Sequence, residues 1–197
     1  MADKRLLTGR GRRFTLIILT LLLSGCANGT TFRVLDAETR EPIEGAVALA
    51  EWIGGRRMGV IAGPTYAYTA KVVEAVTDRN GIFKIPAVGG SLAMQTPHLK
   101  VYKLGYAGWD SRLIYLGCYE ENRMVSRTTT REDFFMKDQD IYLEPWKDEY
   151  SFNSHDGFID TNASFLKVGK KDSKYLKAIH SEIPFRVRED SLKNKRK

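Results

Sequence analysis

The sequence predicts an all-β fold, a seven-stranded antiparallel β-sandwich with a C-terminal extension that has room for one helix. Three observations lead to this fold class. Short β-rich segments recur between residues 31 and 146, turn-forming residues separate them, and no convincing long helical pattern precedes residue 160. Several short strands divided by turn signals are typical of β-sandwiches.

The expected strands are segments in which β-branched or alternating apolar residues dominate. In the second of them, Ala46, Ala48 and Ala50 fall on one face because successive side chains of a strand point to opposite sides. Alternation likewise turns Phe83 and Ile85 toward the core. The seven strands are expected over residues 31–35, 45–52, 72–77, 82–85, 99–104, 112–116 and 139–143.

The connections between these strands carry their own signals. Residues 53–70 hold four glycines and Pro64, which indicates a long irregular connection. Residues 78–81 read Asp-Arg-Asn-Gly between two β-rich segments, and an Asn-Gly pair in that setting predicts a β-hairpin. Residues 86–97 and 119–137 are expected to be loops.

The character of the chain changes after Trp146, where residues 147–197 form the expected C-terminal extension. Apolar spacing over residues 163–179 can form one helix, although Gly169 interrupts it. Residues 186–197 carry six basic side chains against Glu189 and Asp190 and are expected to be a solvated tail.

The N-terminus has the order of a secretion signal. Basic residues lie between positions 4 and 13, and an apolar run follows over residues 14–23. A membrane-spanning helix needs about 20 apolar residues, so a run half as long is typical of a cleaved signal peptide.

Residues 23–26 read Leu-Ser-Gly-Cys and directly follow the apolar run. This order resembles the lipobox of bacterial lipoproteins, which implies cleavage between Gly25 and Cys26 and a lipid on the Cys26 thiol. Residues 1–25 would then be the signal peptide and residues 26–30 a short lipidated tether. Ala27 after the cysteine resembles enterobacterial signals for the outer membrane, facing the periplasm. The alternatives are an ordinary signal peptide that happens to end in cysteine, or an uncleaved anchor.

Charge and cysteine content narrow the function further. The whole chain carries a net charge of +7, but residues 1–25 hold five of its 31 Lys and Arg and one of its 24 Asp and Glu, which leaves +3 for the remainder. No nucleic-acid partner is expected. With Cys26 lipidated, Cys118 has no intramolecular partner and is expected to be a buried, inert thiol, the alternative being an intermolecular disulfide.

Several motifs resemble carboxypeptidase regulatory-like domains, which have a transthyretin-like seven-stranded sandwich. The resemblance covers roughly residues 31–145 and implies a scaffold rather than an activity. Gly81 supplies a positive φ in a turn, and Asp78 can cap that turn, so these motifs serve folding. The segments that carry the resemblance are 34–39, 42–47, 77–85 and 101–106.

No constellation of catalytic residues emerges. His98, His155 and His180 lack the spacing of a zinc site, and no metal or cofactor is expected. Ser154, His155 and Asp156 are adjacent, but triads assemble in space, so a polar loop is the expected structure there. The transthyretin fold also hosts hydroxyisourate hydrolase, whose closing Tyr-Arg-Gly-Ser motif does not match residues 194–197.

The one candidate surface is aromatic. Tyr106, Trp109 and Tyr115 lie near glycines and could bind a glycan or an envelope protein, the alternative being that they pack in the core. The sequence thus favours a membrane-anchored, non-catalytic binding or structural module of the cell envelope. Two alternatives stay open: an envelope hydrolase with an unrecognised site, and a periplasmic assembly accessory that docks through residues 186–197.

Overall fold

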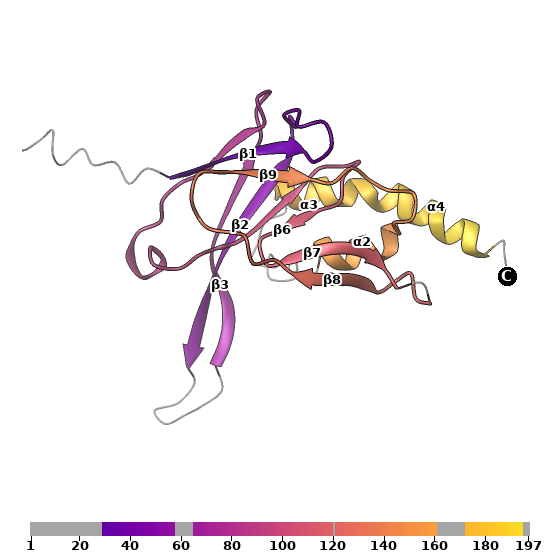
Figure 1. Ribbon diagram of the computed structural model, residues 1–197. Coiled ribbons are helices and arrows are strands. Elements are labelled where there is room, and N and C mark those ends of the chain that lie inside the picture. The colour runs from indigo at the N-terminus through magenta and orange to yellow at the C-terminus, as the bar shows by residue number, and fades with distance from the viewer. Residues whose placement is uncertain (1–28, 58–64, 120, 161–171, 195–197) are drawn as a thin grey trace, which may run out of the picture.

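The computed structural model describes residues 29–57, 65–119, 121–160 and 172–194, and Figure 1 shows their arrangement. These ranges contain nine strands, three α-helices and two short 3-10 helices. The strands are β1 (Thr30–Asp36), β2 (Val47–Arg57), β3 (Thr65–Val76), β4 (Ile82–Ile85), β5 (His98–Tyr102), β6 (Trp109–Asp110), β7 (Leu113–Cys118), β8 (Ser126–Thr130) and β9 (Gln139–Leu143). The helices are η1 (Gly90–Leu92), α2 (Phe152–Asp160), α3 (Lys174–Ile179), η3 (His180–Glu182) and α4 (Ile183–Asn194).

The predicted β-sandwich is confirmed. One sheet has the strand order β4-β1-β9, the second has the order β3-β2-β5-β6, and β7 and β8 form a separate pair. Two details differ from the sequence prediction. The described residues contain nine strands where seven were expected, and β1 pairs with β9 in parallel, so the sandwich is not wholly antiparallel.

The main core lies between the two larger sheets. Phe83 and Ile85 of β4 turn inward as their alternation predicted, while the side chain between them is exposed. Ala46, Ala48 and Ala50 are also fully buried here, since small side chains let the sheets approach closely. The aromatic rings of Phe32 and Phe83 stack with centroids 5.1 Å apart.

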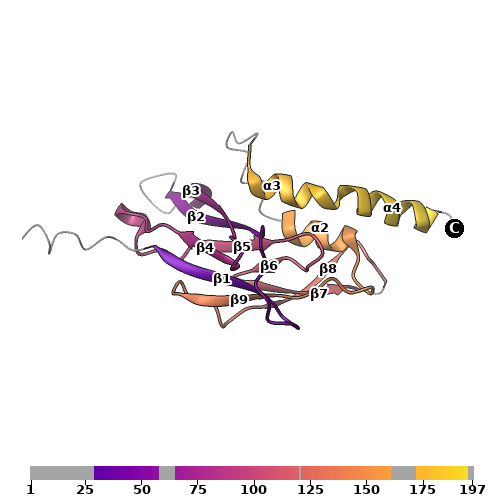
Figure 2. The ribbon, with the colours of Figure 1, turned by 90° about the horizontal axis from the view of Figure 1, so that it is seen from above.

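The helices form a third layer on the outer face of the second sheet (Figure 2). Strand β2 is therefore covered on both faces, which explains its nearly continuous apolar sequence from Val47 to Trp52. Side chains of Val47 and Leu49 pack with Ile159 of α2 and Tyr175 of α3 in a second apolar cluster. The buried side chains of Lys100 and Tyr102 in β5 donate hydrogen bonds to this layer.

The described parts of the irregular connection predicted over residues 53–70, which are residues 53–57 and 65–70, are β-strand. Strands β2 and β3 instead continue as a long antiparallel arm that projects from the body (Figure 1). Gly54 has a local packing reason, because a Cβ there would lie 2.6 Å from the Tyr68 ring. Glycine inside a strand often marks such a close approach rather than a loop.

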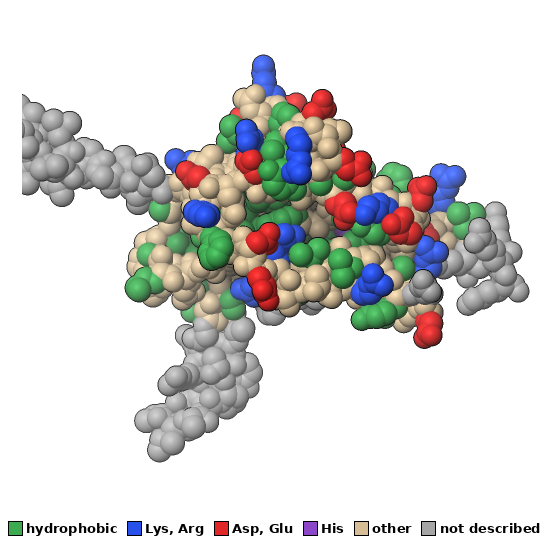
Figure 3. All heavy atoms as spheres, in the orientation of Figure 1, with side chains coloured by type: hydrophobic (Ala, Val, Ile, Leu, Met, Phe, Trp, Pro, Cys, Tyr) green, Lys and Arg blue, Asp and Glu red, His purple; other side chains and the backbone are tan. Residues whose placement is uncertain are grey.

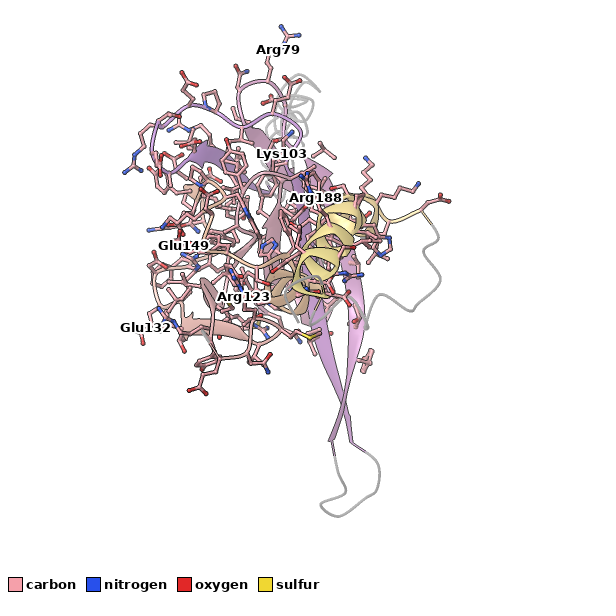
Figure 4. All side chains as sticks on the ribbon, turned by 90° about the vertical axis from the view of Figure 1, so that its right-hand side faces the viewer. Arg79, Lys103, Arg123, Glu132, Glu149 and Arg188 are labelled. Carbon is pink, nitrogen blue, oxygen red and sulfur yellow. The ribbon has the colours of Figure 1, made fainter. Side chains whose placement is uncertain are left out.

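The Asp78–Gly81 turn is present, but the predicted hairpin is wrong. The strand that follows it, β4, pairs with β1, whereas β3 lies in the other sheet, so the turn carries the chain between sheets. Asp78 caps the turn as expected: its carboxylate accepts the backbone N–H groups of Asn80 and Ile82 at 2.9 Å. Figure 4 shows Arg79 pointing away from the body at the tip of this turn.

Gly81→Ala is expected to lower the free energy of unfolding by about 1–3 kcal/mol. Gly81 has a φ of +72°, and a Cβ there would lie 2.4 Å from the carbonyl oxygen of Val34. The matched control is Gly89→Ala, since a Cβ at Gly89 meets nothing within 4 Å. Urea unfolding measures both variants, and equal effects would contradict the strain argument.

Two further expectations need correction. Residues 119–137 contain a strand, β8, in place of a loop without strands. Residues 183–194 form helix α4, so most of the expected basic tail is helical, and Arg186 in it forms an ion pair with Asp156. The helix expected over residues 163–179 lies mostly outside the described residues, and its last part is α3.

Candidate functional site

The lipidation and cleavage residues predicted from the sequence, Gly25 and Cys26, lie outside the described residues. The predicted aromatic surface lies inside them and is not exposed. Trp109 and Tyr115 retain only 8% and 3% of their accessible surface. Tyr106 is half-buried, and its hydroxyl donates a hydrogen bond to Asp36 at 3.0 Å. These aromatic residues pack in the structure instead of presenting a shared binding face.

Each buried aromatic side chain has a specific neighbour. The Trp109 ring meets Phe134 edge-on at 5.4 Å, and the Arg131 guanidinium lies over its face at 4.6 Å. Burial lowers the pKa of the Arg131 guanidinium, and the charge of Asp133 opposes only part of this lowering. Tyr115 packs edge-on against the His155 ring at 5.1 Å. Burial also raises the pKa of Tyr115, to about 12.

His155 is fully buried in α2, so the polar loop expected around it is wrong. Its Nε2 accepts the backbone N–H of Gly108 at 2.8 Å. Its Nδ1 lies 2.9 Å from a carboxylate oxygen of Glu182. Since Nε2 is an acceptor, this hydrogen-bond pattern assigns the ring proton to Nδ1, which donates to Glu182.

Ser154 and His155 do not form a nucleophile–base pair. The Ser154 hydroxyl lies 2.6 Å from the Tyr115 hydroxyl and donates to the Ser151 carbonyl at 3.1 Å. A triad requires the serine hydroxyl to bond to the imidazole, and here both groups have other partners. These contacts hold α2 in place and leave neither group available as a nucleophile or base.

Tyr102, His155 and Glu182 form a first buried polar group, in which Glu182 contacts the other two side chains. Glu182 is 3% exposed and accepts from the Tyr102 hydroxyl at 3.0 Å as well as from His155. Burial and the neighbouring carboxylate both raise the pKa of Tyr102. Three elements, β5, α2 and η3, are thereby linked through one carboxylate.

A second polar group lies under the same helices. It consists of Glu51, His98, Lys100 and Asp110, all of them at most 4% exposed. His98 Nε2 is 2.7 Å from an Asp110 oxygen, and the Lys100 ammonium donates to the Ile159 carbonyl at 3.3 Å. Lys100 also lies 3.9 Å from Asp110. We refer to both groups together as the polar junction.

Three side chains of the second group, Asp110, Lys100 and Glu51, have pKa values shifted from their ordinary values. Burial favours the neutral acid at Asp110, but the hydrogen bond from His98 and the charges of His98 and Lys100 hold its pKa below the ordinary value. Burial lowers the pKa of Lys100. Burial raises the pKa of Glu51, and neither of its carboxylate oxygens has a hydrogen-bond partner within the described residues.

The polar junction therefore acts as a structural connection between sheet and helices. Within the described ranges, no group of three or more His, Cys, Asp or Glu side chains is placed to hold a metal ion. The same part of the chain contains no helix long and apolar enough to cross a membrane. A charged residue within an apolar strand was the available sequence signal, at Glu51 in β2 and Lys100 in β5.

Cys118 differs from its expected state as well. Its thiol is free and half-buried, where a fully buried thiol was expected. It borders a hollow of about 940 Å³ whose rim mixes charges of both signs, among them Arg123, Arg127 and Glu144.

Comparisons with known proteins add little to this description. No protein-family model matches the chain, and no curated protein matches it. Among solved structures, the C-terminal domain of a shaft pilin from Lactobacillus rhamnosus GG is similar with a TM-score of 0.29 and 17% identity, over 60% of this chain and 98% of that one. A 9R-lipoxygenase from Cyanothece has a TM-score of 0.24 and 18% identity, over 59% of this chain and 16% of that one. These comparisons establish no family, and the β-sandwich rests on the strand pairing of the chain itself.

Proposed function

We propose that the chain is a lipid-anchored, non-catalytic module of the bacterial cell envelope, attached to the membrane through Cys26. The observation that carries this proposal is the order of basic residues, a short apolar run and Leu-Ser-Gly-Cys over residues 4–26. A lipid anchor with two or more acyl chains would hold the protein stably at a membrane surface.

The position of the first strand supports a module that stands close to the bilayer. Strand β1 begins at Thr30, four residues after Cys26. A fully extended chain spans at most about 3.6 Å per residue, so the start of the sandwich is within roughly 15 Å of the anchor. The sandwich would therefore work next to the membrane surface and not at the end of a long stalk.

The polar junction supports a non-catalytic role. A general base must reach the proton that it abstracts, and a nucleophile must reach its substrate. Ser154 and His155 are fully buried, and their polar atoms are engaged with Tyr115, Gly108 and Glu182. This arrangement fits a protein whose buried polar groups fix the fold.

Cys26→Ala is expected to move the protein from the membrane fraction to the soluble fraction, because the acyl acceptor is lost. Membrane fractionation with intact-mass analysis measures both location and lipid. The matched control is Cys118→Ala, which removes the other cysteine of the chain and should remain acylated and membrane-bound. Wild-type protein that carries no lipid in native membranes would contradict the anchor.

A further inference from the structure

We propose that one end of the sandwich, formed by the uncharged loop residues 86–97 and the start of β1, lies directly against the lipid bilayer. This inference rests on the proposed anchor at Cys26 and adds a second, non-covalent contact with the membrane. We call this surface the tether end. Figure 1 shows the loop and the beginning of β1 at the same end of the molecule.

The composition of the loop is the first argument. Residues 86–97 read Pro-Ala-Val-Gly-Gly-Ser-Leu-Ala-Met-Gln-Thr-Pro and contain no charged side chain, although 28% of the chain is charged. The loop is nevertheless largely exposed, and Met94 at its turn is 96% exposed. A segment without charged groups can enter an apolar environment at a lower desolvation cost than a charged surface can. In Figure 3 the corner of the molecule nearest this loop shows green and tan spheres.

A hollow at the tether end is also lined without charged side chains. It has a volume of about 290 Å³, and none of the residues that line it is charged. Four other hollows on the described surface each include charged side chains. The lining combines the start of β1 with the loop and two core side chains, and includes Gly29, Thr30, Trp52, Pro86, Met94 and Met136.

Trp52 is the aromatic side chain that lines this hollow. The side chain is 98% buried, and its indole N–H has no partner within the described residues. Because the indole nitrogen is inaccessible, Trp52 contributes an apolar wall to the hollow and no direct contact with lipid.

One exposed aromatic residue lies at the same end. The segment before β9 is attached to the start of β1, because Asp138 accepts the backbone N–H of Thr31 at 2.7 Å. In this segment Phe135 is 59% exposed, and the Lys137 ammonium lies 5.5 Å from its ring. An exposed aromatic ring with a neighbouring ammonium suits the boundary between acyl chains and lipid phosphates.

The position of the anchor selects a bilayer as the partner. Gly29 lines the hollow and is three residues from Cys26, a distance of at most about 11 Å. An acyl anchor at residue 26 would therefore hold the tether end close to the lipid surface. Two exposed apolar side chains there, Met94 and Phe135, can then enter the interface with little further loss of entropy.

Site-specific fluorescence tests this contact in the full-length lipidated protein. A Met94→Cys variant on a Cys118→Ser background is labelled with an environment-sensitive fluorophore and reconstituted into phosphatidylcholine–phosphatidylglycerol vesicles that contain nitroxide lipids. The matched control is Met124→Cys, which replaces another exposed methionine, 67% exposed, in the β7–β8 turn at the opposite end (Figure 1). We expect at least about twofold stronger quenching at position 94 than at position 124.

Intact mass of the same samples separates the two possible failures. Acylated protein with equal quenching at both positions would overturn the membrane contact of the tether end and leave the anchor intact. Protein without lipid would overturn the anchor and, with it, the bilayer contact. Stronger quenching at position 94 in acylated protein supports both.

Discussion

Glu182→Ala is expected to lower the free energy of unfolding by about 3–5 kcal/mol. The carboxylate is 3% exposed and accepts hydrogen bonds from both Tyr102 and His155. Its removal leaves two buried donors without an acceptor, and each unsatisfied buried donor costs about 1–3 kcal/mol. The lost side chain also leaves a cavity between β5 and α2.

The experiment is urea unfolding followed by circular dichroism and by tryptophan fluorescence, since the Trp146 ring lies 5.1 Å from the His155 ring. Glu182→Gln keeps one acceptor oxygen and should lose less than Glu182→Ala, which provides a measurable variant if alanine prevents folding. Glu149→Ala is the control, because Glu149 is exposed (Figure 4) and should change stability by less than about 0.5 kcal/mol. Similar losses for Glu182→Ala and Glu149→Ala would contradict the central position of this carboxylate.

Local pattern was sufficient to predict much of the sandwich. Strands β1, β4 and β9 lie within two residues of their expected positions, because alternation of apolar residues determines which face is buried. The inward alanines of β2 followed from the same rule. Pairing did not follow from it: the parallel contact of β1 with β9 joins residues more than 100 positions apart, such as Phe32 and Gln139.

Elements that depend on tertiary contacts escaped prediction. Strand β8 reads Ser-Arg-Thr-Thr-Thr and is almost wholly exposed, so it has no alternating pattern of burial. Helix α4 is rich in charge, and the carboxylate of Glu189 bonds to the Ser151 hydroxyl at 2.7 Å, a contact that no local signal indicates. Tertiary packing commonly stabilises such helices more than intrinsic propensity does.

The candidate site was predicted only in part for the same reason. His155 was visible in the sequence, but its partners Gly108 and Glu182 are 47 and 27 residues away, so its burial could not be inferred. Trp109 and Tyr115 pack in the core, which was the alternative to an exposed binding surface. The charges inside β2 and β5 were the one local signal of a buried polar group, because isolated charges within apolar strands are rare.

Glu51→Gln is expected to stabilise the protein by about 1–3 kcal/mol at pH 8 and to have little effect at about pH 4. Burial raises the pKa of Glu51 in the folded chain above its ordinary value. The folded protein therefore keeps a proton on Glu51 at pH values where the unfolded chain has released it. Stability from this group is present at low pH and is lost as the pH rises through the folded pKa. Glutamine mimics the protonated acid at every pH and removes this loss.

The charges around Glu51 shift its pKa in opposite directions. Lys100, His98 and Arg112 favour ionised Glu51, whereas burial and Asp110 oppose it. Urea unfolding of wild type and variant at both pH values compares these effects directly, with Glu132→Gln as the control because Glu132 lies at the exposed periphery (Figure 4). A variant less stable than wild type at pH 8 would mean that attraction to Lys100 outweighs the burial of an unpartnered carboxylate. A gain confined to high pH would mean that Glu51 is retained at a cost in stability, because glutamine then gives the more stable fold.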